Sequence, residues 1–136
     1  DLECWKRAAV LRKKISQLVK RFPNDEKYRL VDQLIRASRS VTANIAEGYG
    51  RYYYQEYTQY CRQGRGSLYE VIDHLTVAEE EQYITKEELN EYKLEIAKCL
   101  AVLNGFINYL AKAKSSNAVN EPEPYYSNTN NSVHPD

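Results

Sequence analysis

Four stretches of the chain carry apolar or small residues at alternating three- and four-residue steps, the pattern of helices that bury one stripe. The members of the four stripes are Cys4, Ala8, Leu11, Ile15, Leu18 and Phe22; Val31, Leu34, Ser38, Val41, Ile45 and Gly48; Tyr57, Cys61, Gly64, Leu68, Val71, Leu75 and Ala78; and Leu89, Tyr92, Ile96, Cys99, Leu103, Phe106 and Leu110. The stripes predict helices over residues 3–22, 25–47, 53–81 and 86–113. Because long helices with short connections pack side by side, we expect an all-α, antiparallel up-down four-helix bundle.

Two of the helix starts carry capping signals. Thr85 and Glu88 have the spacing of a capping box, and Ile84 and Leu89 have that of a hydrophobic staple. Asn24 stands before two acidic residues, so it is the predicted N-cap of the helix over residues 25–47.

The last part of the chain differs in composition from the rest. Residues 115–136 consist mainly of Ser, Asn, Pro and Glu without helical periodicity. This composition predicts a disordered, polar low-complexity tail behind a bundle of residues 1–114. If a contact holds the tail, Tyr125 and Tyr126 are the expected anchors.

Charge is balanced over the whole chain and separated along it. The 136 residues include 19 Lys and Arg and 19 Asp and Glu, which gives a net charge of zero. Residues 1–72 carry +6 (14 basic, 8 acidic) and residues 73–136 carry −6 (5 basic, 11 acidic). Any attraction for a polyanion is therefore expected in the first half.

The lengths of apolar runs and the spacing of the cysteines bear on the cellular compartment of the protein. The longest uninterrupted apolar run is Cys99–Leu103, well below the roughly 20 residues of a membrane span. We therefore expect no membrane-spanning segment and, without a secretory leader, a cytoplasmic protein. The three cysteines lie far apart and contain no C-x-x-C spacing, so we expect buried core residues rather than a disulfide or zinc site.

A run of residues in the second predicted helix, Ser-Val-Thr-Ala-Asn-Ile-Ala-Glu-Gly over 40–48, is followed by Arg51, by Gly-Ser-Leu-Tyr-Glu over 66–70 and by Gln-Tyr-Ile over 82–84. With Trp5-Lys6 and Phe-Pro-Asn-Asp-Glu over 22–26, this set resembles the bacterial family of 23S rRNA intervening-sequence proteins. The resemblance covers about residues 4–112. The chain departs from the family pattern at Gly64, where the family tends to have Ala, and at Gln82, where it tends to have Gly.

The resemblance implies a small, non-enzymatic four-helix bundle, commonly a homopentamer, that is often encoded inside an insertion in the large ribosomal RNA gene. A related branch is the accessory protein of diversity-generating retroelements, which works with a reverse transcriptase and its template RNA. Both relationships make RNA an expected partner.

Basic residues of the first predicted helix form the main candidate RNA site. Two heptad-spaced stripes are predicted to point away from the core, and their members are Lys6, Lys13 and Lys20, and Arg7, Lys14 and Arg21. A row of cations of this kind suits a phosphate backbone. The alternative is an ordinary solvated face whose Lys20 and Arg21 neutralise acidic residues at the start of the fourth helix.

Six tyrosines occur within residues 49–60, with Arg51 among them and Arg62 and Arg65 just beyond. Rings beside guanidinium groups can stack on unpaired bases, so these three arginines are further RNA candidates. Packing accounts for Tyr53, Tyr57 and Tyr60. The remaining tyrosines, Tyr49, Tyr52 and Tyr54, are candidates for a subunit interface. Leu100 and Ile107, which exceed what one core is expected to bury, and Glu47 of the motif are further interface candidates. For Glu47 the alternative is an ion pair with Arg51.

Polar and glycine residues on or near the stripes have predicted structural roles. Ser38 and Asn44 are expected to be hydrogen-bonded because buried polar groups without partners are costly. Gly64 and Gly66 are expected to allow the close approach of another helix.

Catalysis has little support in the sequence. A di-iron bundle needs Glu-x-x-His on two helices, whereas the only histidine in a predicted helix is His74. We expect no catalytic residue, metal, cofactor or small-molecule substrate. The expected function is RNA binding by a homo-oligomer, with a pentamer as first choice; the alternatives are a retroelement accessory protein that binds a reverse transcriptase and template RNA, or a purely structural ring.

Overall fold

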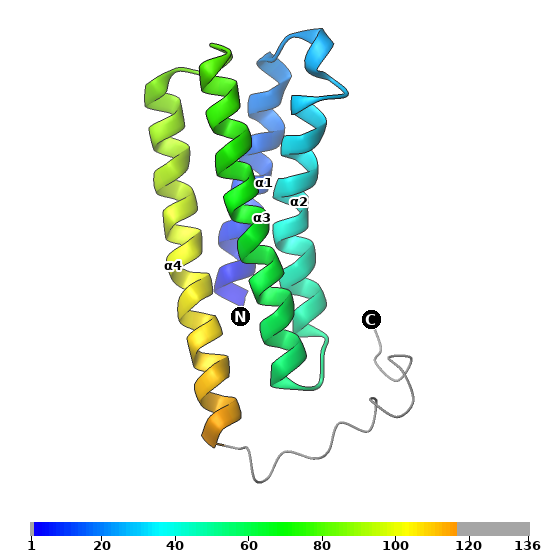
Figure 1. Ribbon diagram of the computed structural model, residues 1–136, viewed down its shortest axis with the longest axis vertical. Coiled ribbons are helices and arrows are strands. Elements are labelled where there is room, and N and C mark those ends of the chain that lie inside the picture. Colours follow the sequence, from blue (N-terminus) through cyan, green and yellow to red (C-terminus); the bar gives the residue numbers. More distant parts are fainter. Residues whose placement is uncertain (1, 117–136) are drawn as a thin grey trace.

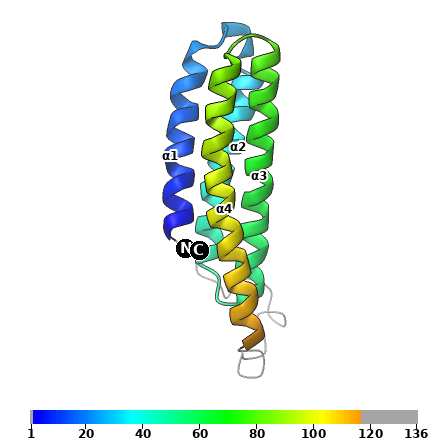
Figure 2. The ribbon, with the colours of Figure 1, turned by 90° about the vertical axis from the view of Figure 1, so that its left-hand side faces the viewer.

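The computed structural model describes residues 2–116, which form four long helices. These are α1 (Leu2–Leu18), α2 (Leu30–Tyr49), α3 (Tyr54–Glu80) and α4 (Lys86–Ser116), and two 3₁₀ helices, η1 (Val19–Arg21) and η2 (Asn24–Glu26), join α1 to α2. Each helix runs antiparallel to the next, and α4 packs against α1, which completes the four-helix bundle (Figures 1 and 2). The predicted all-α four-helix bundle is confirmed.

The core is built from the predicted stripes. Its largest fully buried side chains come from all four helices: Leu11, Ile15, Leu34, Leu68, Leu75, Ile96, Leu103, Leu110, Val41, Val71, Cys4 and Cys61. The third cysteine, Cys99, is also buried, and all three thiols are free. The prediction that the cysteines are small core residues is therefore confirmed.

The start of α2 differs from the prediction. Residues 24–26 form η2 and α2 begins at Leu30, and Asn24 makes no capping hydrogen bond. Glu26 takes that role: its Oε1 accepts the N–H of Leu30 at 3.3 Å, and its Oε2 accepts the hydroxyl of Tyr83 at 2.7 Å. The Tyr83 hydrogen bond lowers the pKa of Glu26, and the same bond raises the pKa of Tyr83 to about 12. One carboxylate thus connects the start of α2 to the turn between α3 and α4.

The α3–α4 turn follows the predicted capping chemistry. The N–H of Thr85 donates to Oε1 of Glu88 at 2.9 Å, and the N–H of Glu88 donates to Oγ1 of Thr85 at 3.0 Å. Just before the box, Gln82 has a φ of 67°. This left-handed backbone favours glycine, which is the residue that the family pattern tends to have there.

Helix α4 is the longest element, at 31 residues, and its last turns continue past the first residues of α1 (Figures 1 and 2). By length and composition, residues 86–113 would suffice to cross a membrane, although core helices of soluble proteins pass the same test. The expectation that the chain has no membrane-spanning segment stays a prediction. The predicted tail lies outside the described residues except for Ser115 and Ser116, which belong to α4.

The core assignment can be tested with two leucines of the same helix. Leu103 is 1% exposed and Leu94 is 66% exposed. We expect Leu103→Ala to lower the free energy of unfolding by about 2–5 kcal/mol, because it removes buried methyl groups and leaves a cavity. Leu94→Ala should change it by less than about 0.5 kcal/mol. Chemical denaturation measures both, and equal values for the two variants would contradict the helix phase.

Candidate nucleic-acid and subunit interfaces

The outward face of α1 carries a straight row of lysines. Lys6, Lys13 and Lys20 are exposed and recur every seven residues, about 10.5 Å along an α-helix. The predicted helix over residues 3–22 ends earlier, at Leu18, so Lys6 and Lys13 lie on α1 and Lys20 lies on the 3₁₀ helix η1 that continues it. Among the described residues, no ion pair joins any of the three to an acid. The row has the geometry predicted for it.

The second basic stripe of α1 is arranged differently from the prediction. Arg7 pairs with Glu3 at 2.9 Å, Lys14 lies 3.4 Å from Glu95, and Arg21 makes a two-pronged contact with Glu88 at 2.6 and 3.0 Å. Lys14 and Arg21 therefore contact acids of α4, although about half of each side chain stays exposed (52% and 51%). Of the two interpretations of Arg21, neutralisation at the start of α4 is the one that the contacts favour.

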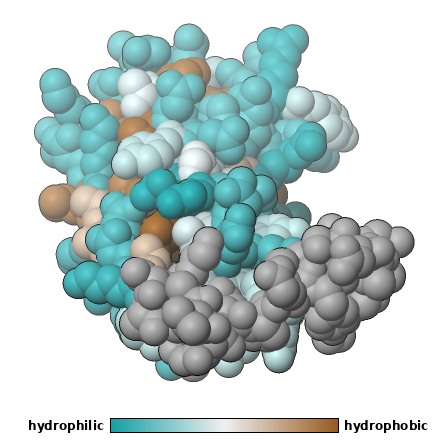
Figure 3. Space-filling model, turned by 60° about the horizontal axis from the view of Figure 1, so that its bottom comes forward, coloured by the Kyte–Doolittle hydropathy of each residue, from teal (hydrophilic) through white to brown (hydrophobic). Residues whose placement is uncertain are grey.

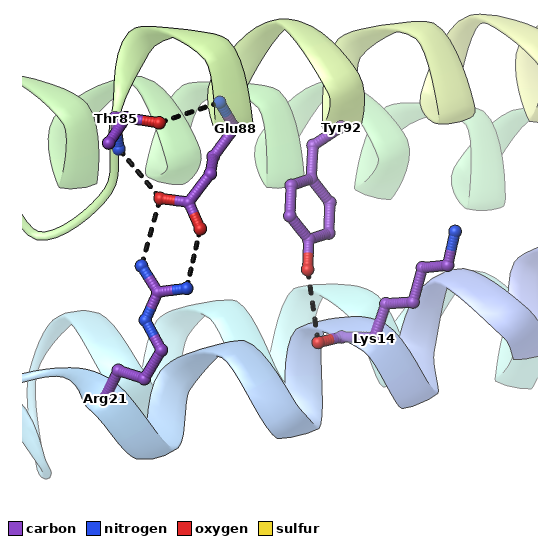
Figure 4. Close-up of polar contacts among 5 residues, drawn as sticks. All are labelled: Lys14, Arg21, Thr85, Glu88 and Tyr92. Carbon is purple, nitrogen blue, oxygen red and sulfur yellow. Dashed lines mark hydrogen bonds and ion pairs between the residues drawn. The ribbon is translucent and has the colours of Figure 1, made fainter.

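Glu88 is the centre of the seam between α1 and α4. In Figure 4 its carboxylate receives both prongs of Arg21 and the N–H of Thr85, while the hydroxyl of Tyr92 donates to the backbone carbonyl of Lys14 at 3.3 Å. The hydrogen bond from Arg21 is the main cause that lowers the pKa of Glu88 to about 2. Burial raises the pKa of Tyr92.

The seam between α1 and α2 adds arginines that the sequence analysis missed. Arg12 donates to Oγ1 of Thr42 at 2.9 Å and lies 5.7 Å from the ring of Trp5, and the Thr42 hydroxyl in turn donates to the carbonyl of Arg39 at 3.1 Å. Arg39 itself is exposed. The basic face therefore extends from α1 onto α2. Arg39 could have been found from its place on the outer face of the second predicted helix.

The arginines near the tyrosines separate into different environments. Arg51 has only 9% of its side chain exposed, pairs with Glu47 at 2.6 Å and donates to the hydroxyl of Tyr60 at 3.0 Å. Arg65 donates to Asn104 of α4 at 2.8 Å, whereas Arg62 is exposed. The buried Arg51 and its partner Glu47 thus hold the corner between α2 and α3, and Arg62 is the arginine of this group that faces solvent.

The candidate interface residues differ in how far they are exposed. Tyr49 and Tyr52 are exposed, and Tyr54 and Leu100 are half-buried. Ile107 is 5% exposed, because α4 turns it into the core of the bundle, so the prediction that it is surplus to one core is wrong. Seen from its lower end, the molecule shows apolar surface between hydrophilic side chains (Figure 3).

Glycines control how closely α3 approaches α2. A Cβ built on Gly48 would lie 2.9 Å from both Cδ1 of Tyr57 and Cβ of Tyr60, so only glycine fits without movement. At Gly64 a Cβ would come 3.5 Å from the carbonyl oxygen of Val41, an ordinary contact, and at Gly66 it would meet nothing within 4 Å. The predicted close approach holds for Gly64 and not for Gly66.

Polar groups on or near the stripes are hydrogen-bonded, as predicted for Ser38 and Asn44. Ser38 donates to the carbonyl of Ile35 at 3.1 Å, and Asn44 donates to the carbonyl and hydroxyl oxygens of Ser40 at 2.9 and 3.0 Å. The hydroxyls of Ser67 and Ser40 are 2.9 Å apart. This last bond, which the sequence did not predict, joins α3 to α2.

Within residues 2–116, potential metal ligands and nucleophiles do not cluster into a site. No group of three or more His, Cys, Asp and Glu in this part could hold a metal ion. Burial raises the pKa of each cysteine thiol, Cys4, Cys61 and Cys99, to about 11. Neutral thiols are poor nucleophiles and poor metal ligands, so these residues serve the packing.

The fit between α2 and α3 can be tested at two glycines. We expect Gly48→Ala to lower the free energy of unfolding by about 1–3 kcal/mol, because the new methyl group overlaps Tyr57 and Tyr60. The control Gly66→Ala places a methyl group in open space on a helix and should raise that free energy by up to about 1 kcal/mol. Thermal unfolding compares the two, and a gain at both positions would contradict the close approach.

The Arg21–Glu88 contact predicts a pH dependence of stability. Since the pKa of Glu88 falls from 4.5 to about 2 on folding, its contribution is complete above pH 4.5 and is lost as the pH falls through about 2. Glu88→Gln keeps a capping group but removes the charge. We expect the variant to be less stable at neutral pH by about 1 kcal/mol, given the half-exposed Arg21.

Denaturation at a series of pH values checks this expectation. The difference between wild type and Glu88→Gln should shrink between pH 4.5 and 2. The neighbouring Glu87 is exposed, so Glu87→Gln is the matched control and should show little difference at any pH. A Glu88→Gln difference that stays constant with pH would contradict the assignment.

Comparisons with known proteins agree with this geometry. No curated protein matches the chain. A crystal structure of a protein of unknown function from the S23 ribosomal protein family of Bacteroides thetaiotaomicron superposes with a TM-score of 0.70 at 19% identity, over 76% of this chain and 97% of that one, which shows a shared fold. A family model described as 23S rRNA-intervening sequence protein matches residues 1–105. The chain therefore belongs to the 23S rRNA-intervening sequence protein family.

Proposed function

We propose that this chain is a non-enzymatic, homo-oligomeric protein that binds RNA through the outer face of α1 and the adjoining part of α2. The observation that carries the proposal is the row of Lys6, Lys13 and Lys20, exposed along α1 and η1 and not paired with acids in the described part of the chain. Such a row contacts phosphates without reading sequence.

The distribution of acids supports this choice of face. Between residues 2 and 21 the only acidic residue is Glu3, and Arg7 already pairs with it. The acids that face α1 from α4 are Glu88, Glu91 and Glu95, of which Glu88 and Glu95 are engaged by Arg21 and Lys14 and Glu91 lines the same hollow as Lys14. The positive potential of the lysine row and of Arg39 on α2 therefore remains directed outward.

Assembly is proposed from exposed apolar surface. Only 28% of the most apolar window of α4 is buried within the bundle, and Tyr109 on this helix is 63% exposed. Tyr49 and Tyr52, at 73% and 67%, add aromatic surface at the corner between α2 and α3. Patches of this kind on soluble proteins mark interaction sites. The family resemblance makes five copies the first choice.

Oligomerisation would strengthen RNA binding. Each copy would repeat the lysine row around a ring, so contacts of modest affinity would add through multivalency. Two alternative functions predict different ligands. A retroelement accessory protein would bind a reverse transcriptase and its template RNA, and a purely structural ring would bind no RNA. Sequencing the nucleic acid that co-purifies with the protein separates ribosomal RNA, template RNA and none.

The RNA site can be tested by charge reversal. We expect Lys6→Glu/Lys13→Glu/Lys20→Glu to weaken binding to structured and single-stranded RNA. The slope of log affinity against log salt should flatten by roughly 0.7–0.9 for each phosphate that the variant no longer neutralises. Fluorescence anisotropy across a salt series measures both quantities.

The matched control is Lys27→Glu/Lys86→Glu/Lys93→Glu, which reverses three exposed lysines outside α1 and leaves the net charge equal to that of the first variant. If both triple variants lose affinity equally, net charge rather than the α1 row governs binding. If the wild type binds no RNA at low salt, the structural ring is favoured. Light scattering and circular dichroism confirm that assembly and fold are unchanged.

Assembly has a separate test. We expect light scattering at micromolar concentration to give a multiple of the 15.9 kDa chain mass, with a pentamer as first choice. Tyr49→Ser/Tyr52→Ser should reduce the mass, because it removes exposed rings without opening the core. The control Tyr28→Ser removes a ring that is 83% exposed near the opposite end and should leave the mass unchanged. A wild-type mass equal to one chain would contradict the proposal.

A further inference from the structure

A groove opens at the lower end of the bundle, where α4 continues past α1. Its volume is ≈590 Å³, and its wall is mainly aromatic, with contributions from Tyr49, Tyr54, Tyr57, Val102, Phe106 and Tyr109. The side chains come from three helices, so the groove is a product of the fold and not of one segment. Figures 1 and 2 show the end of α4 standing clear of the other helices here.

The rings of the groove form a continuous surface. The ring centroids of Tyr57 and Phe106 are 5.1 Å apart, those of Tyr49 and Tyr57 are 6.2 Å apart, and those of Phe106 and Tyr109 are 6.0 Å apart. Tyr49 and Tyr109 keep most of their surface exposed. Aromatic-lined grooves of this type bind proline-rich segments, which enter in a preformed extended helix at low entropic cost.

Cations stand at both ends of the groove along α4. Lys98 lies one turn before Val102 and Lys112 one turn after Tyr109, so both share the helix face of the groove. Both lysines are exposed and are not paired with an acid in the described part of the chain. The acids nearest in sequence to the groove residues of α2 and α3 are Glu47, which pairs with Arg51, and Glu56, which is half-buried. The groove thus suits a segment that is aromatic, proline-rich and acidic.

We propose that the segment Glu-Pro-Glu-Pro-Tyr-Tyr, residues 121–126 of this same chain, docks in the groove. Pro122 and Pro124 supply flat surfaces for the rings, Tyr125 and Tyr126 supply aromatic anchors, and the two glutamates lie within the segment to meet the lysines. No other part of the sequence combines these three properties.

The length of chain after α4 permits docking within one molecule. From Ser116, where α4 ends, the groove residue Tyr109 lies seven residues back, about 10 Å along the helix. The six residues from Ser116 to Pro122 span up to about 20 Å when extended. The segment can therefore fold back over the last two turns of α4 without a second copy.

The docked segment would cover Tyr49 and Tyr54, which belong to the surface proposed for subunit contact. It would then compete with assembly at this end of the bundle. The docking depends on the groove and the segment alone, so it stands whether or not the chain binds RNA.

The two phenylalanines of the chain give a direct test. Phe106 lines the groove, while Phe22 lies 5.3 Å from Tyr83 at the opposite end of the bundle. Full-length protein labelled with 4-fluorophenylalanine therefore gives one fluorine signal from the groove and one internal reference. A soluble paramagnetic agent reports how accessible each ring is.

We expect Pro122→Ala/Pro124→Ala/Tyr125→Ala/Tyr126→Ala to increase paramagnetic relaxation of the Phe106 signal and to leave the Phe22 signal unchanged, which also shows that the fold is retained. Lys98→Glu/Lys112→Glu should act in the same direction. The control Ser127→Ala/Asn128→Ala/Asn130→Ala/Asn131→Ala lies beyond the segment and should change neither signal.

Two outcomes would overturn the proposal. Equal relaxation of Phe106 in the wild type and the quadruple Pro/Tyr variant would show that the segment does not cover the groove. Protection of Phe106 that rises with protein concentration would show that a second copy, and not the segment of the same chain, is the occupant. Protection that is independent of concentration and absent from the Pro/Tyr variant would support it.

Discussion

The close packing of α3 on α2 is the contact on which the rest of the molecule depends. It is the most extensive contact between helices, and it requires Gly48, since a larger residue would overlap Tyr57 and Tyr60. The bond between Ser40 and Ser67 fixes the register of the two helices in the same interface. Because α2 and α3 are positioned in this way, their outer edges receive α1 and α4.

The contacts that α1 makes with its neighbours are more polar, and they decide which of its cations face solvent. Arg12 reaches Thr42 on α2, while Lys14 and Arg21 reach acids on α4. The side chains midway between these two seams have no helix beside them. Lys6, Lys13 and Lys20 are therefore exposed because α1 is fastened on both sides, and the candidate RNA surface is a consequence of how the helix is held.

Much of the fold could be predicted from the sequence because periodicity reports burial directly. The apolar stripes predicted the core residues, and the capping box of Thr85 and Glu88 predicted the start of α4, since both signals depend on residues close together in the chain. The start of α2 was predicted wrongly because Glu26, rather than Asn24, caps the helix. Glu26 is held in place by a hydrogen bond from Tyr83, which is 57 residues away in the sequence and cannot be recognised from local signals.

The candidate site was less predictable for the same physical reason. The pairing of Arg21 with Glu88 and the placement of Ile107 in the core depend on how helices rotate against one another, which periodicity specifies only approximately. The outward lysine row was predicted correctly because it lies opposite the core stripe, where such rotation matters least.

The two ends of the bundle are closed by different chemistry. At one end, Glu26 binds Tyr83 and Glu88 binds Arg21, both through a charged carboxylate, and the Arg21 side chain is 51% exposed. At the other, Tyr57 packs edge-on against Phe106, and the ion pair of Arg51 with Glu47 leaves only 9% of the arginine side chain exposed. Dissolved salt weakens attractions between charges but not contacts between rings, whereas cooling weakens apolar association. The exposed ion pair of Arg21 is open to screening by dissolved ions and the nearly buried ion pair of Arg51 is much less so, and ionic strength therefore acts more strongly on the end of the bundle where α3 turns into α4.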